Sequence, residues 1–148
     1  MNEEHYDESC AMAAGAISAA FRDALSGEAL RALVESVLGA CASLDPEALS
    51  RRCRRSRRTL ARDLRKAGLP TPAAVVAWGR IFAASEMLAD ESRSVESVSL
   101  ALGLSDSAAL VHLYRHHAGP TPGEVRERGG IAYAIGIFKA RVARSRLG

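Results

Sequence analysis

The densest group of chemically active side chains is a run of arginines between Arg51 and Lys66. Nine residues of this segment are basic, and Asp63 is its single acid. A positive field this concentrated suits a polyanionic partner, because phosphate neutralisation supplies most of the non-specific affinity for nucleic acid. A solvated helix face with no partner would show the same residues, so the run alone leaves both interpretations open.

The charges are divided unevenly along the chain. Residues 1–50 carry nine acids and two bases, a net charge of −7, and residues 51–148 carry eighteen bases and eight acids, a net charge of +10. The total of +3 conceals this asymmetry. We expect residues 1–9 to be a loose acidic tail, and this tail is a candidate autoinhibitory segment that would cover the basic run.

The other reactive residues show no catalytic or metal-binding pattern. His112 and His116 share one helix face, but no carboxylate or cysteine completes a zinc site. The cysteines are three, widely spaced and without a CxxC pair, which predicts reduced thiols and a buried role for Cys53. The sequence also lacks a glycine-rich phosphate loop and a GxSxG motif. We therefore expect no enzyme, no cofactor and no metal.

The composition predicts one all-α domain. Hydrophobic residues make up 48% and charged residues 25% of 148 residues, which is typical of a globular chain. Aromatic residues are few, alanine, leucine and arginine are plentiful, and no segment alternates like a strand. The apolar stretch Ala11–Phe21 is too short to span a bilayer and follows acids, so we expect a cytoplasmic protein with no membrane partner.

Apolar periodicity and capping signals place the elements. They predict helices at about 10–25, 28–42, 46–53, 57–67, 73–89, 94–103, 106–118 and 131–144. Asp45, Ser56 and Ser105-Asp106 are the expected N-caps of three of them. The stripes Ile17-Phe21-Leu25 and Ile131-Ile135-Phe138-Val142 need apolar partners, either in the same chain or in a homodimer through these terminal helices.

An internal duplication organises the basic segment. The pattern Leu49-Ser50-x-x-Cys53-x-x-Ser56 matches Val98-Ser99-x-x-Leu102-x-x-Ser105 at an offset of 49. After one inserted residue, Leu60 and Leu64 match Leu110 and Tyr114, and both copies end in a glycine followed by Thr-Pro. A short helix, a turn and a capped second helix form a helix-turn-helix, so the sequence predicts two such units.

The second helix of the first unit suits the DNA major groove. Leu60 and Leu64 would face the core, which turns Arg57, Arg58, Ala61, Arg62 and Arg65 outward. Arginine binds the guanine edge with two hydrogen bonds, so arginines on this face could read bases and the flanking basic residues could grip phosphate.

Residues 45–128 resemble the DNA-binding domain of the AraC/XylS family of bacterial regulators. The resemblance rests on the segments Ser56–Gly68, Arg80–Leu88, Val95–Asp106 and Gly119–Arg126. It implies seven helices, with helix-turn-helix units at about 45–68 and 94–118 and a connector helix at about 73–89. Residues 1–44 would be an acidic N-terminal region, and residues 129–148 an extra C-terminal helix. A connector of that length spans about 25 Å, against about 34 Å between successive major-groove segments.

The resemblance implies a sequence-specific, double-stranded DNA-binding transcription regulator, with RNA polymerase as a further candidate partner. The predicted DNA-binding residues of the first unit are Arg54, Arg55, Ser56, Arg57, Arg58, Thr59, Arg62, Arg65 and Lys66. Those of the second unit are Ser105, Ser107, Ala108, Ala109, His112, Arg115 and His116.

Two departures from the family pattern bear on this assignment. Arg54 and Arg55 stand where the family has glycine and then an apolar residue, and an arginine with positive φ would be uncommon. Ala108, Ala109 and His112 occupy the base-facing positions of the second unit, where they read bases weakly. We therefore expect the first unit to read the sequence, through Arg58 and Arg62, and the second to hold the backbone, through Ser105 and Arg115. The alternative is a protein-interaction module on the same scaffold, which binds another regulator or RNA polymerase.

Overall fold

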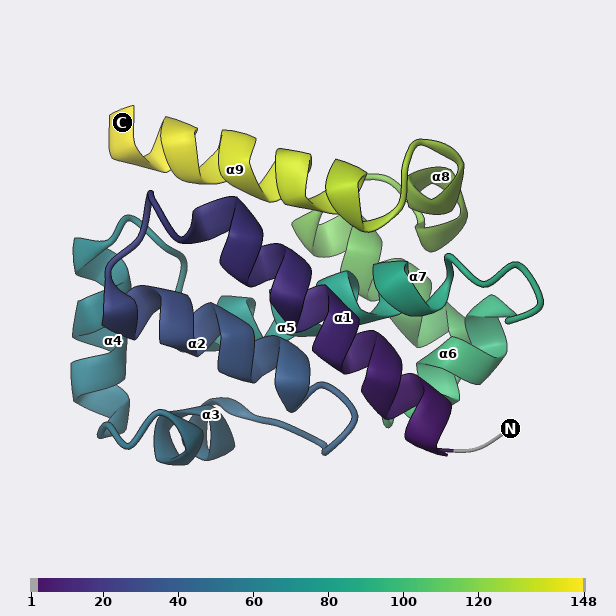
Figure 1. Ribbon diagram of the computed structural model, residues 1–148, viewed down its shortest axis with the longest axis horizontal. Coiled ribbons are helices and arrows are strands. Elements are labelled where there is room, and N and C mark those ends of the chain that lie inside the picture. Colours follow the sequence, from purple (N-terminus) through teal and green to yellow (C-terminus); the bar gives the residue numbers. More distant parts are fainter. Residues whose placement is uncertain (1–2, 148) are drawn as a thin grey trace.

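The computed structural model describes residues 3–147 and the side chains of residues 5–144; residues 1, 2 and 148 lie outside the described part. Residues 3–147 hold nine α-helices and no strand, which confirms the predicted all-α fold. The helices are α1 (Glu3–Phe21), α2 (Gly27–Leu38), α3 (Pro46–Arg52), α4 (Arg57–Lys66), α5 (Pro72–Met87), α6 (Val95–Ala101), α7 (Ser107–His117), α8 (Pro122–Glu127) and α9 (Ile131–Leu147) (Figure 1).

The connector helix α5 lies at the centre and contacts each of the other eight helices. Eleven of its sixteen residues are buried, including Trp78, Ile81 and Phe82. A helix that is apolar on all sides must be covered on all sides, so α5 is the common core of both helix-turn-helix units. The sequence had indicated a stripe on this helix; the structure shows apolar contact around its whole circumference.

Helices α2 and α5 cross at their closest where Gly79 meets Ser36. A Cβ placed on Gly79 would lie 2.5 Å from the backbone oxygen of Ser36. The Ser36 hydroxyl donates a 2.6 Å hydrogen bond to the Leu33 carbonyl within α2, so this buried polar group is satisfied. Only glycine permits this approach, which sets the spacing between the two helices.

Helix α1 corrects the expectation of a loose acidic tail. It is helical from Glu3, and both Tyr6 and Ser9 are buried. The Tyr6 ring lies 4.6 Å from the guanidinium carbon of Arg93, whose Nη1 also donates to Ser9 Oγ at 3.0 Å. Buried contacts of this kind order the segment. They hold it beside α6, whereas α4 lies at the other end of the molecule, so the autoinhibitory expectation is wrong for residues 5–9 (Figure 1).

Helix α9 packs against the core of its own chain. The Phe138 ring contacts Trp78, Phe82 and Phe21 edge-on, with ring centroids 5.0, 5.6 and 5.7 Å away. Edge-to-face pairs at these distances add to the burial of apolar area. Of the two apolar stripes, Ile17, Phe21 and Phe138 are buried within the chain. The other stripe residues are half-buried, namely Leu25, Ile131, Ile135 and Val142.

Besides α1, which runs from Glu3 to Phe21 rather than from about 10 to 25, two elements differ from the sequence expectation. Helix α2 ends at Leu38 rather than near Ala42, and a run of turns with positive φ at Ser43 follows. Helix α8 was not predicted by periodicity, and with it residues 45–128 hold six helices, α3 to α8, rather than the seven that the resemblance implies. The Thr121 hydroxyl accepts from the Glu124 amide, and the Glu124 carboxylate accepts from the Thr121 amide. This capping box stabilises a helix too short to show periodicity. No described helix has the length and apolar character needed to cross a membrane.

We predict that Gly79→Ala lowers the free energy of unfolding by roughly 1–3 kcal/mol, because the new methyl group meets rigid backbone of α2. Gly15→Ala in α1 is the matched control, since a Cβ there meets nothing within 4 Å. That variant should gain roughly 0.5–1 kcal/mol from helix propensity. Urea unfolding of both variants measures the difference, and equal stabilities would contradict the proposed role of this crossing.

Candidate nucleic-acid interface

The turn of the first helix-turn-helix follows α3. Arg54 adopts φ 55°, and its amide donates to the Arg51 carbonyl at 3.1 Å. The next amide, of Arg55, donates to the Ser50 carbonyl at 3.0 Å. This pair of hydrogen bonds closes the helix with a residue in the left-handed conformation. Arg54 therefore has the positive φ that was expected at the position where the family has glycine.

The second unit has the same turn with glycine in place of arginine. Gly103 adopts φ 77° and donates to Leu100, and Leu104 donates to Ser99, both at 3.0 Å. The duplication seen in the sequence is thus a duplication of backbone geometry. The left-handed conformation costs a non-glycine residue about 1–2 kcal/mol, and Arg54 bears that cost.

Helix α4 presents its arginines as the sequence predicted. The Ser56 hydroxyl accepts from the Thr59 amide at 3.1 Å and fixes the start of the helix. Leu60 and Leu64 are buried at 1% exposure and hold the opposite face on the core. The outward face carries four exposed arginines and a lysine: Arg57, Arg58, Arg62, Arg65 and Lys66.

Acidic residues engage part of the arginine cluster. Arg55 Nε lies 3.1 Å from Asp63 and 3.4 Å from Glu28 of α2. Arg57 lies 3.6 Å from Glu47 of α3. Ion pairs this exposed each contribute less than about 1 kcal/mol, but they orient the arginines toward the protein. The Arg55–Glu28 pair could not be predicted from residue spacing, because Glu28 lies on a separate helix.

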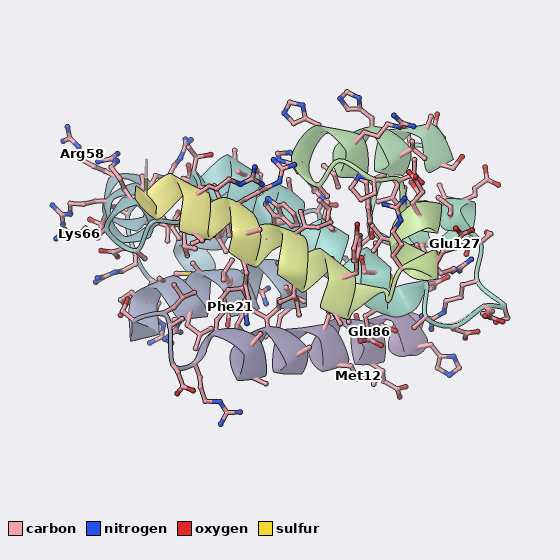
Figure 2. The ribbon with its side chains drawn as sticks, turned by 90° about the horizontal axis from the view of Figure 1, so that it is seen from above. Met12, Phe21, Arg58, Lys66, Glu86 and Glu127 are labelled. Atoms are coloured by element: carbon pink, nitrogen blue, oxygen red, sulfur yellow. The ribbon has the colours of Figure 1, made fainter. Side chains whose placement is uncertain are left out.

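The remaining cations point away from the protein. Within the described side chains, no ion pair engages Arg54, Arg58, Arg62, Arg65 or Lys66. Figure 2 shows Arg58 and Lys66 extending from the same end of the molecule into solvent. Arg58 and Arg62 are one helical turn apart and both exposed, so their guanidinium groups project from one face.

Helix α7 of the second unit is anchored by a buried tyrosine. The Tyr114 hydroxyl donates to the Ile81 carbonyl of α5 at 3.0 Å and lies 2.8 Å from Ser85 Oγ. Complete burial raises the pKa of Tyr114, so this phenol stays protonated as a donor. Asp106 caps the helix by accepting from the Ala109 amide at 2.9 Å. Both interactions fix α7 relative to the central helix.

The outward face of α7 is less basic than that of α4. Ser105, Ala108, His112, Arg115 and His116 are exposed, and Ser107 and Ala109 are half-buried. The rings of His112 and His116 stack with centroids 6.1 Å apart. Burial and then the neighbouring His116 hold the pKa of His117 below its usual range. No group of three or more potential metal ligands occurs among the described residues.

One basic residue beside this surface, Arg141, was not predicted from the sequence. Arg141 of α9 donates to the Ala118 carbonyl at the end of α7, at 3.2 Å. The same side chain lines a pocket with Gly68, which follows α4, and with His116 and His117 of α7. The C-terminal half of α9 therefore lies between the ends of the two second helices. The bases on α9 were visible in the sequence, but their position depends on the packing of Phe138.

Comparison with known proteins identifies this region. The family model described as a helix-turn-helix domain, of the AraC type, matches residues 49–128. The match spans more than half of the chain, from the middle of α3 to just past the end of α8. No curated protein and no solved structure gives a significant match.

We predict that Arg54→Gly raises the free energy of unfolding by roughly 0.5–1 kcal/mol, because glycine adopts the left-handed conformation without strain. The equivalent change in the second unit, Gly103→Ala, should lower it by a similar amount. Thermal and urea unfolding of the two variants test this. A loss of stability in Arg54→Gly would show that the arginine side chain itself supports the turn.

Proposed function

Since the chain belongs to the AraC/XylS family of DNA-binding transcription regulators, we propose that it recognises a specific double-stranded sequence and reads it mainly through α4. The observation that carries the proposal is the pair Arg58 and Arg62. Both are exposed, both lie on the face opposite the buried Leu60 and Leu64, and no described acid engages either.

The charge arrangement of the first unit supports base reading by these two residues. Each guanidinium can donate two parallel hydrogen bonds to the O6 and N7 atoms of guanine in the major groove. Arg65 and Lys66 lie farther along the helix and suit phosphate contacts, as does Arg54 in the turn. Arg55 is engaged by Asp63 and Glu28, so we assign it to positioning α4 on α2 rather than to DNA.

The strained turn also supports a DNA contact at Arg54. Gly103 shows that glycine suits this backbone position. An arginine retained there at a cost in stability points to a role for its side chain outside the fold, since strain of this kind concentrates at functional sites. A phosphate contact uses the charge of Arg54 and needs no specific geometry from it.

We assign the second unit to holding the DNA backbone. Ala108 and His112 offer little hydrogen bonding to base edges at neutral pH. Arg115 and Ser105 are exposed donors suited to phosphate oxygens. Helix α5 has sixteen residues and spans about 24 Å. A rigid spacer of this length suits units that contact one DNA face in successive grooves.

Selection from a random duplex library, followed by binding of the selected sequence across a salt series, tests the proposed function. A shared motif bound well above bulk DNA supports a sequence-specific regulator. Motif-free binding that collapses with salt would mean that the protein holds only the backbone. No DNA binding at all would overturn the proposal and favour a protein-interaction module on this scaffold.

We predict that Arg58→Ala and Arg62→Ala each weaken binding to the selected sequence by about 1–3 kcal/mol and relax the base preference at one position. Arg22→Ala, which removes an exposed arginine just after α1, is the matched control for net charge. Gel-shift titrations on the selected duplex and on its single-base variants measure both effects. Unchanged specificity in both α4 variants would overturn their assignment as readers.

We predict that Arg115→Ala, unlike the two α4 variants, weakens DNA binding without changing the base preference. Loss of a phosphate contact should weaken all duplexes alike and reduce the slope of log K against log salt by about 0.9. The selected motif should stay the same. A changed base preference in this variant would show that α7 also reads sequence.

A further inference from the structure

We propose that Cys10 and Cys41 form a reversible intrachain disulfide when the protein meets a hydroperoxide, so that the pair is an oxidation site. The two Sγ atoms lie 3.7 Å apart, although 31 positions separate the residues. Both are free thiols in the structure. The inference does not rest on the proposed DNA reading, because it concerns α1 and the turns that follow α2.

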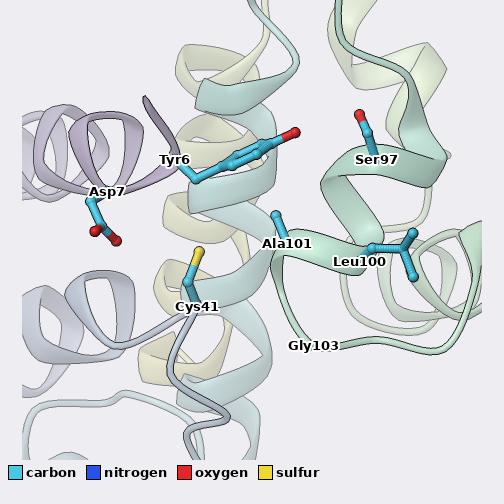
Figure 3. A pocket seen from close by; sticks show the side chains of 7 residues that line it. All are labelled: Tyr6, Asp7, Cys41, Ser97, Leu100, Ala101 and Gly103. Carbon is cyan, nitrogen blue, oxygen red and sulfur yellow. The ribbon is translucent and has the colours of Figure 1, made fainter. Parts of the chain in front are cut away.

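Cys41 is the accessible thiol of the pair, and the buried Cys10 is suited to be the resolving thiol. Cys41 is half-buried and lines a surface pocket of about 520 Å³ between α1 and α6, with Tyr6, Asp7 and Leu100 among its other walls (Figure 3). Cys10 lies behind it at 3% exposure. A hydroperoxide entering the pocket therefore reaches Cys41 first.

The hydrogen bond between the two thiols also favours Cys41 as the reactive one. The two thiols share a hydrogen bond in which either sulfur can donate. With Cys10 as the donor, the contact lowers the pKa of the Cys41 thiol and raises that of Cys10. Burial and the charge of Asp7 oppose ionisation of Cys41, and both are smaller than the hydrogen bond. The thiolate is the nucleophile in cysteine oxidation, so the accessible thiol is also the more reactive of the two.

The chemistry balances with hydrogen peroxide as the oxidant. The Cys41 thiolate attacks one peroxide oxygen; an S–O bond forms, the O–O bond breaks, and the departing hydroxide takes a proton to become water. The Cys10 sulfur then attacks the Cys41 sulfenic sulfur. An S–S bond forms, the S–O bond breaks, and hydroxide leaves as a second water with the Cys10 proton. Two thiols lose two electrons in total, and one peroxide gains them.

The backbone can accommodate the new bond. The sulfurs must close from 3.7 Å to about 2.05 Å. Cys41 lies in the turns between Gly39 and Ser43, outside any helix, so it can move without breaking helical hydrogen bonds. Cys53 provides an internal comparison, because it is buried and burial raises its pKa to about 11.

The test treats the reduced full-length protein with a small excess of hydrogen peroxide, then maps alkylated tryptic peptides by mass spectrometry. We expect two of three thiols to be lost and the peptide of residues 1–22 to be joined to that of residues 32–51, with reversal by dithiothreitol. Under non-reducing conditions the midpoint of thermal unfolding should rise by about 5 °C or more. Retention of three thiols, or a cross-link through Cys53, would overturn the proposal.

Two variants test which thiols take part in the reaction. Cys53→Ser should oxidise like the wild type. Cys10→Ser should give no cross-link and should instead accumulate a sulfenic acid on Cys41 that dimedone labels. Circular dichroism confirms that each variant is folded, and the wild-type peptide map decides the question without either. Equal dimedone labelling of Cys41 and Cys53 in Cys10→Ser would contradict the selectivity claimed for Cys41.

Discussion

Gly79 meets the backbone of Ser36 so closely that no side chain fits between α2 and α5, and the arrangement of the DNA-binding units depends on this contact. With α2 held there, Glu28 reaches Arg55 and Glu35 reaches Arg52. These pairs tie the first unit to α2. The second unit is tied to the same central helix through the Tyr114 hydroxyl. One buried helix therefore sets the position of both units.

The uneven division of charge follows from this arrangement. Two acids from the first fifty residues, Glu28 and Glu35, pair with Arg55 and Arg52 on the inner side of the first unit, and a third, Glu47, pairs with Arg57 at the start of α4. The arginines on the outer side, Arg58 and Arg62, have no such partner among the described residues. The acidic N-terminal part thus neutralises the inner side of the cluster and leaves the outer side positive. Three of the nine acids in residues 1–50 thus have a structural role in these pairs.

Local signals in the sequence predicted much of this fold. Contacts between residues far apart in the chain could not be predicted from such signals. The caps at Asp45, Ser56 and Asp106 are formed as expected, because a cap depends on residues three positions apart. The burial of Leu60 and Leu64 followed from helical periodicity. The ordering of α1 did not follow, because Tyr6 and Ser9 are held by Arg93, more than eighty residues away. The base-reading roles of Arg58 and Arg62 stay predictions, since they depend on a partner outside the chain.

The two units are copies in which the framework is kept and the outward residues differ. At an offset of 50, Leu60 and Leu64 correspond to Leu110 and Tyr114, and all four are buried. On the outer face, Arg65 corresponds to Arg115, whereas Arg58 and Arg62 correspond to Ala108 and His112. The position suited to phosphate thus stays basic in both copies, and the positions suited to bases do so in the first alone. A duplicated scaffold with one set of base-reading arginines fits a protein that holds DNA at two places and reads it at one.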